Sequence, residues 1–217
     1  MIGDASKNYD AVAFQADIAV SRETLARLER YAALLREWQA RINLVGPATL
    51  PDLWRRHFLD SAQLLRHLPE SVGCLVDLGS GAGFPGLVLA ILGVPNVHLV
   101  ESDQRKVAFL RTVAGATGTA VTIYPRRIEA LPRLGADVVT ARALAPLASL
   151  VAYGLTLLGP GGVCLFLKGQ QADAEVEAAA ARWAMTVDRL PSLTDSSGVI
   201  LRLSGLAPKL DAGEIKR

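Results

Sequence analysis

Short runs of apolar and β-branched residues recur from residue 74 to residue 203, and segments of helical composition separate most of them. Strands at this interval need helical crossovers, because two parallel strands cannot be joined by a tight turn. We therefore expect an α/β fold with a doubly wound, mostly parallel seven-stranded sheet and helices on both faces. The predicted strands cover residues 74–78, 97–101, 119–124, 136–140, 162–167, 185–190 and 199–203, the last two forming a hairpin.

The N-terminal part of the chain has a helical pattern. Residues 21–42 carry apolar side chains at the spacing of one helix face, after the cap-type residue Ser21. A second stripe of Trp54, Phe58 and Leu65 indicates a partner helix over residues 51–67. The predicted division is a helical extension over residues 1–70 that packs on a main domain over 71–204, followed by a loose tail over 205–217.

Composition limits the class of protein. With 217 residues, 51% of them hydrophobic, the chain can bury the core of one main domain. Its longest stretch without charge, residues 143–167, is broken by Pro146 and by glycines, so it predicts a core helix and a core strand and no membrane span. Cys74 and Cys164 lie in apolar runs and predict buried, reduced thiols. We expect a soluble cytoplasmic protein without a signal peptide or a metal site.

A glycine-rich turn, VDLGSGAGFPG over residues 76–86, follows the first predicted strand and opens a helix at Pro85. Asp77 stands at the end of that strand, and Glu101 stands at the end of the next one. An acidic residue before G-x-G-x-G with a second one after the next strand resembles S-adenosylmethionine-dependent methyltransferases. In that arrangement the Glu101 carboxylate accepts hydrogen bonds from the ribose hydroxyls.

The same turn allows a second interpretation. Residues 81–86 fit the G-x-G-x-x-G pattern of dinucleotide-binding folds, which favours an NAD-dependent oxidoreductase. That fingerprint requires its first glycine at the strand end, where Gly79 already stands. The register therefore favours S-adenosylmethionine, and the oxidoreductase stays open as an alternative.

Several separated motifs resemble one family. They are WQARINL (38–44), HFLDS (57–61), VDLGSGAGFPG (76–86), LVESDQRKVAFL (99–110), RIE (127–129), DVVTARA (137–143) and KG (168–169). Together they resemble the bacterial small-subunit ribosomal RNA methyltransferase G family, also called the glucose-inhibited division protein B family. The resemblance implies a Rossmann-like class I methyltransferase fold and methylation of N7 of a guanine in 16S rRNA.

The turn and the resemblance together give the expected cofactor site. S-adenosylmethionine is the expected cofactor. The turn contributes Asp77, Gly79, Ser80, Gly81 and Gly83, and the resemblance adds Phe84, Ile128, Glu129 and Arg142 while supporting Gly79 and Glu101.

Guanine N7 presents a lone pair with no proton to remove, so its methylation needs no general base. Holding the two reactants at near-attack distance can supply roughly 7–11 kcal/mol. Arg142, at the end of the fourth strand, is the expected orienting residue, which could hold the cofactor carboxylate, a phosphate or guanine O6. Its alternative role is a structural ion pair with a carboxylate such as Glu129.

Charge is unevenly distributed along the chain. The net charge is only +2, but the segment from residue 105 to residue 142 holds seven basic and two acidic residues. The expected partner is 16S rRNA, in the small ribosomal subunit or its assembly intermediate, bound by a monomer. The alternatives are solvated helix faces and a non-catalytic RNA-binding assembly factor. The expected RNA-binding residues are Arg56, His57, Arg105, Lys106, Arg126, Arg127 and Lys168.

Two of these residues, His57 and Lys168, have alternative roles that involve no contact with RNA. His57 and Asp60 share one helix face, so they could form a hydrogen-bonded pair that fixes the helix to the sheet. Lys168 could be a solvated loop charge and not a phosphate contact.

Overall fold

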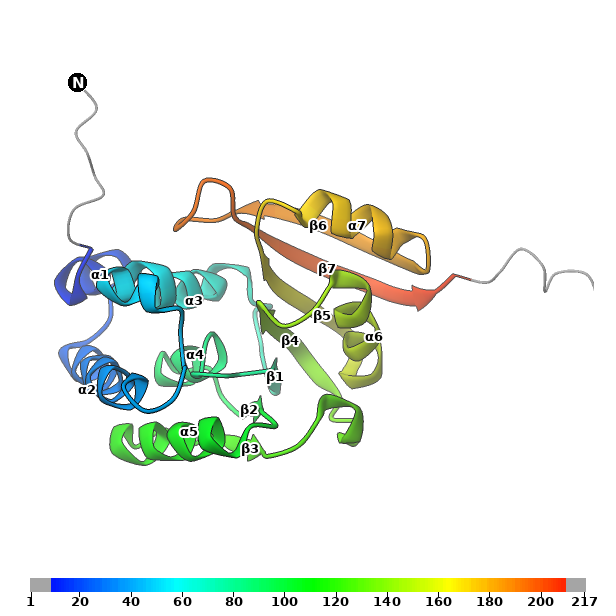
Figure 1. Cartoon of the computed structure of the whole chain (residues 1–217). Helices are drawn as coiled ribbons and strands as arrows, with labels where there is room; N and C mark the ends of the chain where they lie inside the picture. Colours follow the sequence, from blue (N-terminus) through cyan, green and yellow to red (C-terminus); the bar gives the residue numbers. More distant parts are fainter. Residues whose placement is uncertain (1–8, 210–217) are drawn as a thin grey trace, which may run out of the picture.

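The computed structural model describes residues 9–209. These residues form a seven-stranded sheet in the order β3-β2-β1-β4-β5-β7-β6 (Figure 1). The first five strands pair in parallel, and β7 runs antiparallel to both β5 and β6. This confirms the predicted sheet. The strands are β1 (Leu75–Leu78), β2 (Val97–Val100), β3 (Thr122–Tyr124), β4 (Ala136–Arg142), β5 (Leu158–Lys168), β6 (Trp183–Pro191) and β7 (Val199–Pro208).

Helices cover both faces of the sheet and create two hydrophobic cores. Alternate residues of β1 show this division, because Leu75 packs in one core while Val76 and Leu78 pack in the other. The first core contains α4 (Gly86–Ile91) and α5 (Gln104–Thr117), and the second contains α6 (Leu147–Leu157) and α7 (Ala172–Ala180).

The N-terminal segment is helical, as predicted. It contains α1 (Ala11–Ile18) and α2 (Arg22–Gln39), and the Ser21 side chain caps α2 by accepting a hydrogen bond from the Thr24 N–H. Both helices bury apolar residues in the core that also holds α4 and α5. The extension therefore packs against α4 and α5, the helices that lie beside the first strands of the sheet (Figure 1).

The predicted single helix over residues 51–67 is wrong in detail. The chain forms a 3-10 turn (η1, Pro47–Asp52), a π-turn (η2, Trp54–Leu59), a short α3 (Asp60–Ala62) and a second 3-10 turn (η3, Gln63–His67). The Asp60 N–H donates to the Arg55 carbonyl, five residues earlier, and the Arg56 carbonyl accepts from Arg142 instead. This outside donor explains the local change of pitch, a feature that often marks functional sites.

Three strand boundaries differ from the predictions by three residues or more. The third strand begins only at Thr122, because the Thr119 N–H is used to end α5 at the Ala114 carbonyl. The fifth begins at Leu158 and includes the glycines of residues 159–162. The seventh continues to Pro208, paired with Trp183, so residues 205–208 are strand and not tail. The rest of the predicted tail, from residue 210, lies outside the described residues.

Two further predictions concern the thiols and the membrane. Both cysteines are free, but only Cys164 is buried, and Cys74 is half-buried at the start of β1. In residues 9–209 no helix is long and apolar enough to span a membrane.

Candidate active site

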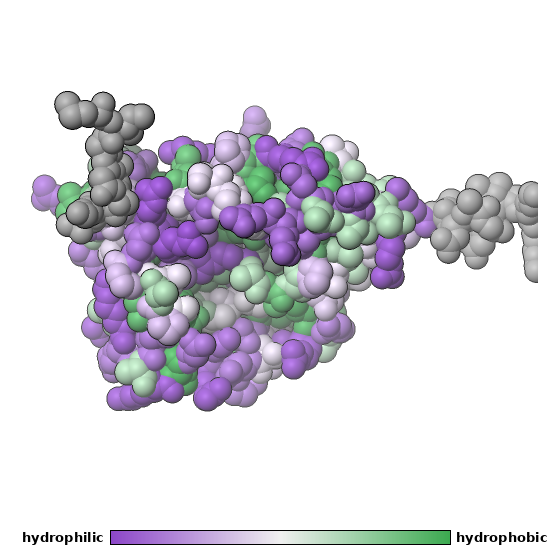
Figure 2. All heavy atoms as spheres, turned by 45° about the horizontal axis from the view of Figure 1, so that its top comes forward, coloured by the Kyte–Doolittle hydropathy of each residue, from purple (hydrophilic) through white to green (hydrophobic). Residues whose placement is uncertain are grey.

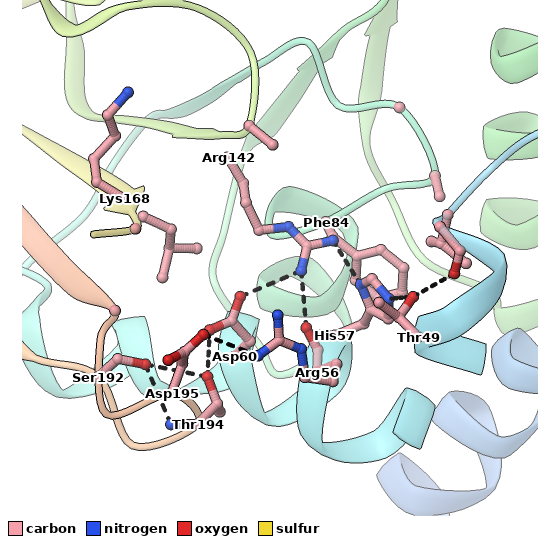
Figure 3. Close-up of a pocket in the computed structure, with 18 of the residues that line it drawn as sticks. Thr49, Arg56, His57, Asp60, Phe84, Arg142, Lys168, Ser192, Thr194 and Asp195 are labelled. Carbon is pink, nitrogen blue, oxygen red and sulfur yellow. Dashed lines mark hydrogen bonds and ion pairs between the residues drawn. The ribbon is translucent and has the colours of Figure 1, made fainter. Parts of the chain in front are cut away.

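A cleft of about 610 Å³ opens at the carboxyl ends of β1, β4 and β5. Ligands of open α/β sheets bind at this edge, where the strand order reverses. Figure 3 shows the side chains that converge there from the N-terminal extension, the glycine turn and the β6–β7 loop. The polar and charged residues that line it are Thr49, Arg56, His57, Asp60, Ser80, Lys106, Arg142, Lys168, Glu175, Ser192, Thr194 and Asp195.

The glycine turn forms one wall of the cleft. Gly79 and Gly81 have φ of +61° and +56°, a conformation that only glycine adopts at low cost. Both glycines line the cleft and present only backbone atoms to it. Ser80 and Phe84 of the same turn line it as well. Glu101 fixes the shape of this turn, because its Oε2 accepts from the Gly81 N–H at 2.9 Å. The other carboxylate oxygen of Glu101 accepts from the Asp103 N–H at 2.7 Å.

Asp77, Gly83 and Glu101 do not line the cleft. Asp77 is fully buried beneath the turn, where its Oδ1 accepts from the Thr140 hydroxyl at 2.8 Å. Burial raises its pKa to about 6. A Cβ on Gly86 would lie 2.5 Å from the Asp77 Cβ, which explains the glycine at the start of α4. Asp77 therefore supports the turn from below.

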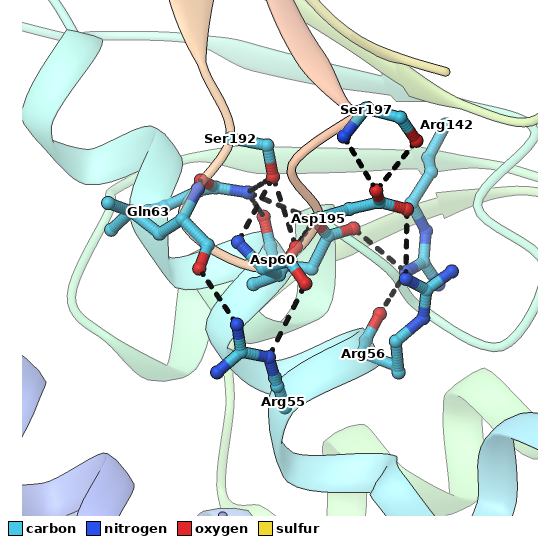
Figure 4. A network of polar contacts seen from close by, with 10 residues as sticks. Arg55, Arg56, Asp60, Gln63, Arg142, Ser192, Asp195 and Ser197 are labelled. Carbon is cyan, nitrogen blue, oxygen red and sulfur yellow. Dashed lines mark hydrogen bonds and ion pairs between the residues drawn. The ribbon is translucent and has the colours of Figure 1, made fainter. Parts of the chain in front are cut away.

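Arg142 lies at the centre of a polar network (Figures 3 and 4). Its Nη1 donates to the Arg56 carbonyl at 3.0 Å and to Asp60 Oδ2 at 3.2 Å, and its Nη2 donates to His57 Nδ1 at 2.8 Å. Its guanidinium carbon lies 5.0 Å from the centre of the Phe84 ring. The ion pair predicted as an alternative exists, but Asp60 and not Glu129 is the partner.

The hydrogen bonds of His57 define its protonation state. Because a guanidinium only donates, His57 Nδ1 must accept from Arg142. His57 Nε2 therefore carries the proton and donates to the Thr49 hydroxyl at 2.7 Å, which in turn donates to the Gly46 carbonyl at 2.7 Å. Burial, with Arg142 and Arg56 nearby, lowers the pKa of His57 to about 3. His57 is thus neutral, and both ring nitrogens are occupied.

This environment predicts an acid-dependent loss of stability. Between pH 6.5 and pH 3 the unfolded chain binds a proton at His57 that the folded chain rejects, so the free energy of unfolding falls as pH falls. The slope from this group is at most about 1.4 kcal/mol per pH unit. Asp77 has the opposite effect on stability. Because its pKa is raised in the folded chain, the folded chain binds more protons than the unfolded chain between pH 6 and pH 3.8, and the contribution of Asp77 to the free energy of unfolding rises as pH falls.

The variant His57→Asn isolates the contribution of the histidine. Denaturant unfolding between pH 6.5 and pH 4 should give a shallower loss of stability on acidification for the variant than for the wild-type chain. Parallel pH profiles for the two proteins would contradict the assignment of a buried, neutral His57.

The predicted RNA-binding cations divide into three groups. Arg56 lines the cleft and pairs with Asp195 at 3.1 Å across its rim (Figure 4). Lys106 lines the cleft, and within the described residues it makes no ion pair. The third group does not line the cleft and consists of Arg105, Arg126 and Arg127, all exposed.

Lys168 is not the solvated loop charge considered as one interpretation, and the phosphate contact stays a prediction. Its ammonium group pairs with Glu175 at 2.6 Å and donates to the Ala145 carbonyl at 3.1 Å, and its side chain is only 10% exposed. The same Glu175 oxygen accepts from the Leu147 N–H at the start of α6. Lys168 is therefore neither a solvated charge nor an unpaired cation, and it fixes the loop that follows Arg142.

Two predicted cofactor residues stand apart from the cleft. Ile128 and Glu129 lie in a 3-10 turn, η4 (Ile128–Ala130), and neither lines the cleft. Glu129 accepts from the Tyr153 hydroxyl at 2.6 Å, and this hydrogen bond lowers the pKa of Glu129.

Several cleft residues had no predicted role. Thr49 and the loop residues Ser192, Thr194 and Asp195 come from segments without a chemical motif. In the sequence, Asp195 belonged only to a predicted turn. Its loop contacts the extension through Thr194, whose hydroxyl donates to Asp60 at 2.7 Å. No group of three or more His, Cys, Asp or Glu side chains in residues 9–209 is placed to hold a metal ion.

A glycine turn after β1, an acidic residue after β2 and a cleft at the strand ends define the class I methyltransferases. Solved structures of this class share the fold. The ribosomal protein L11 methylase of Lactobacillus delbrueckii subsp. bulgaricus superposes with a TM-score of 0.55 and 18% identity, over 67% of this chain and 76% of that one. TYW2 of P. horikoshii in complex with MeSAdo superposes with a TM-score of 0.56 and 14% identity, over 76% and 64%.

Sequence comparison narrows the class to a family. A family model described as rRNA small subunit methyltransferase G matches residues 24–199. The ribosomal RNA small subunit methyltransferase G of Paramagnetospirillum magneticum is 61% identical over 184 residues, which are 85% of this chain and 90% of that protein. The protein of the same name from Rhodospirillum centenum is 56% identical over 202 residues, 93% and 94%. The chain belongs to the rRNA small subunit methyltransferase G family, and it is a methyltransferase.

Proposed function

We propose that this chain transfers the methyl group of S-adenosylmethionine to N7 of a guanine in 16S rRNA. The observation that carries the proposal is that Gly79, Phe84 and Arg142 line the same cleft as the basic side chains of Arg56 and Lys106. The family assignment favours this function over an NAD-dependent oxidoreductase and over a non-catalytic assembly factor.

The turn that lines the cleft, and Glu101 behind it, fit the cofactor. The bare backbone at Gly79 and Gly81 permits close approach of a ligand to the end of β1. Glu101 already holds the Gly81 N–H and has lone pairs left for hydroxyl donors. Bound S-adenosylmethionine would supply an electrophilic methyl group on sulfur, and the turn and Glu101 would hold and orient it.

The chain's own residues would act by positioning. His57 cannot serve as a base in this arrangement, because both of its nitrogens are occupied. Arg142 has five N–H groups, and three of them are used by Arg56, Asp60 and His57. The two that remain could donate to an acceptor such as guanine O6 and so orient the base for methyl transfer. Phe84, beneath the guanidinium, fixes the plane of Arg142.

The RNA partner is supported by the charge around the cleft. The face shown in Figure 2 is mostly hydrophilic and carries apolar side chains only in small groups. Arg56 and Lys106 line the cleft, and the exposed Arg126 and Arg127 extend the positive charge beyond it. Arg105 is exposed as well and pairs with Asp103 at 3.5 Å. We propose that these cations contact rRNA phosphates of the small ribosomal subunit or of its assembly intermediate. We also propose that the protein acts as a monomer in the cytoplasm.

The two cleft lysines should respond differently to salt. Lys106→Gln should reduce the slope of log affinity against log salt concentration for a 16S rRNA fragment by about 0.7–0.9, because one phosphate contact is lost. Lys168→Gln is the matched control and should leave the slope unchanged, since Glu175 already neutralises its charge. Equal slopes for Lys106→Gln and wild type would contradict a phosphate contact at Lys106.

Ligand titration separates the proposed function from its main alternative. The protein should bind S-adenosylmethionine, measured by calorimetry, and should not bind NADH, measured by fluorescence. Tight NADH binding without S-adenosylmethionine binding would overturn the proposal.

A further inference from the structure

Tyr31 links the N-terminal extension to the glycine turn. It lies in α2, 51 positions before Ala82 of the turn, and its side chain is completely buried. Its hydroxyl donates to the Ala82 carbonyl, in the middle of the turn. Its ring stacks on Phe84, with 5.3 Å between centroids and 12° between planes. One side chain thus contacts both the backbone and an aromatic residue of the cofactor wall.

The turn is shaped to receive this phenol. A Cβ on Gly83, which has φ of +95°, would lie 2.5 Å from the Tyr31 hydroxyl oxygen. A side chain at position 83 is therefore excluded both by the backbone conformation and by Tyr31. Burial raises the pKa of Tyr31 well above its ordinary value, so the hydroxyl keeps its proton and remains a donor.

Other side chains hold Tyr31 rigidly. Its ring lies edge-on to Phe58 of the π-turn at 5.3 Å and tilted against Phe109 of α5 at 6.2 Å. The phenol therefore has a fixed position from which to hold the turn. Such support is needed because three glycines of one short turn, at positions 79, 81 and 83, occupy left-handed conformations, and glycine loses more conformational entropy on ordering than other residues.

We propose that Tyr31 is a positioning residue for cofactor binding: its hydroxyl keeps the turn in the conformation that lines the cleft. The inference rests on the proposed use of S-adenosylmethionine. If the turn is competent for only part of the time, the apparent dissociation constant rises by the inverse of that fraction. Tyr31 itself does not line the cleft, so its effect on the cofactor is exerted through residues 79–84.

The test compares two removals of a tyrosine hydroxyl from the extension. Tyr31→Phe keeps the stacked ring and leaves the Ala82 carbonyl without its donor. Tyr9→Phe is the control, because the Tyr9 hydroxyl donates only to Asp17 of α1 at 2.9 Å. Calorimetric titration with S-adenosylhomocysteine should show about 5- to 30-fold weaker binding for Tyr31→Phe and unchanged binding for Tyr9→Phe.

Hydrogen exchange supplies the readout that a merely structural role would not give. The Gly83 and Phe84 N–H groups both donate to the Ser80 carbonyl inside the turn. In Tyr31→Phe these amides should exchange faster, while amides of β1 and β4 keep their wild-type rates.

Two results would overturn the proposal. One is unchanged affinity and unchanged exchange of the turn in Tyr31→Phe. The other is faster exchange throughout the sheet, which would show a general loss of stability. If the wild-type protein fails to bind S-adenosylhomocysteine, the proposed function fails instead, and exchange at Gly83 and Phe84 still decides whether Tyr31 orders the turn.

Discussion

Gly79→Val is expected to weaken binding of S-adenosylhomocysteine by at least about a hundredfold and to abolish methyl transfer. Position 79 has φ of +61°, and an added Cβ would lie 2.5 Å from Leu144 Cδ1. A branched side chain there has to leave the left-handed region or displace Leu144, which follows the cleft residue Ala143. Either response changes the surface that receives the cofactor. Calorimetry and a filter assay with labelled cofactor measure the two effects.

Gly118→Val is the matched control for this variant. Gly118 ends α5 with φ of +60°, and an added Cβ would meet nothing within 4 Å. Both variants therefore carry the same backbone strain, and only one of them carries it at the cleft. If both variants lose a similar amount of thermal stability and only Gly79→Val loses cofactor binding, the glycine turn is the cofactor site. Wild-type cofactor affinity in a folded Gly79→Val protein would contradict it.

Arg142→Ala is expected to lower kcat/KM for methyl transfer by about a hundredfold or more and to destabilise the fold by about 3 kcal/mol. The Arg142 and Asp60 side chains are only 18% and 16% exposed, so the substitution leaves a largely buried carboxylate without its cation. It also removes the donor to His57 Nδ1 and the group stacked over Phe84. Denaturant unfolding and steady-state kinetics measure the two changes.

A surface pair provides the control for the arginine. Arg202 pairs with Asp188 at 3.3 Å on the β6–β7 hairpin, with side-chain exposures of 34% and 52%. Arg202→Ala should cost no more than about 1 kcal/mol and leave transfer intact. Arg142→Lys retains the charge without the fork of N–H groups and should recover part of the stability but little of the activity. Near wild-type kcat/KM in Arg142→Lys would show that the fork is not needed.

The sheet and the glycine turn could be predicted from the sequence, because both depend on local patterns. Apolar runs separated by helical segments imply crossovers, and glycines between an apolar strand and Pro85 imply a tight turn at a strand end. The mostly parallel sheet and the final hairpin were therefore confirmed. Strand limits were less certain, since pairing such as that of Trp183 with Pro208 depends on the neighbouring strand.

The partners of the site residues could not be predicted in the same way. Arg142 was a candidate from its place at the end of the fourth strand, but its ion pair with Asp60 joins residues 82 positions apart. The π-turn arises from the same contact, because Arg142 takes the Arg56 carbonyl that a regular helix would use. The pairing of Lys168 with Glu175 depends on how α7 packs against the end of β5. Tyr31 is adjacent to a predicted apolar stripe, and nothing local distinguishes it from a core residue.

The most direct test of the proposed function is methyl transfer to a defined atom. Small ribosomal subunits from cells that lack this protein are incubated with the purified protein and labelled S-adenosylmethionine, and the 16S rRNA is mapped by mass spectrometry. The account predicts label at N7 of one guanine, with none in parallel reactions that contain Gly79→Val. Label on another atom or in another RNA, or no label with a protein that binds the cofactor, would contradict it.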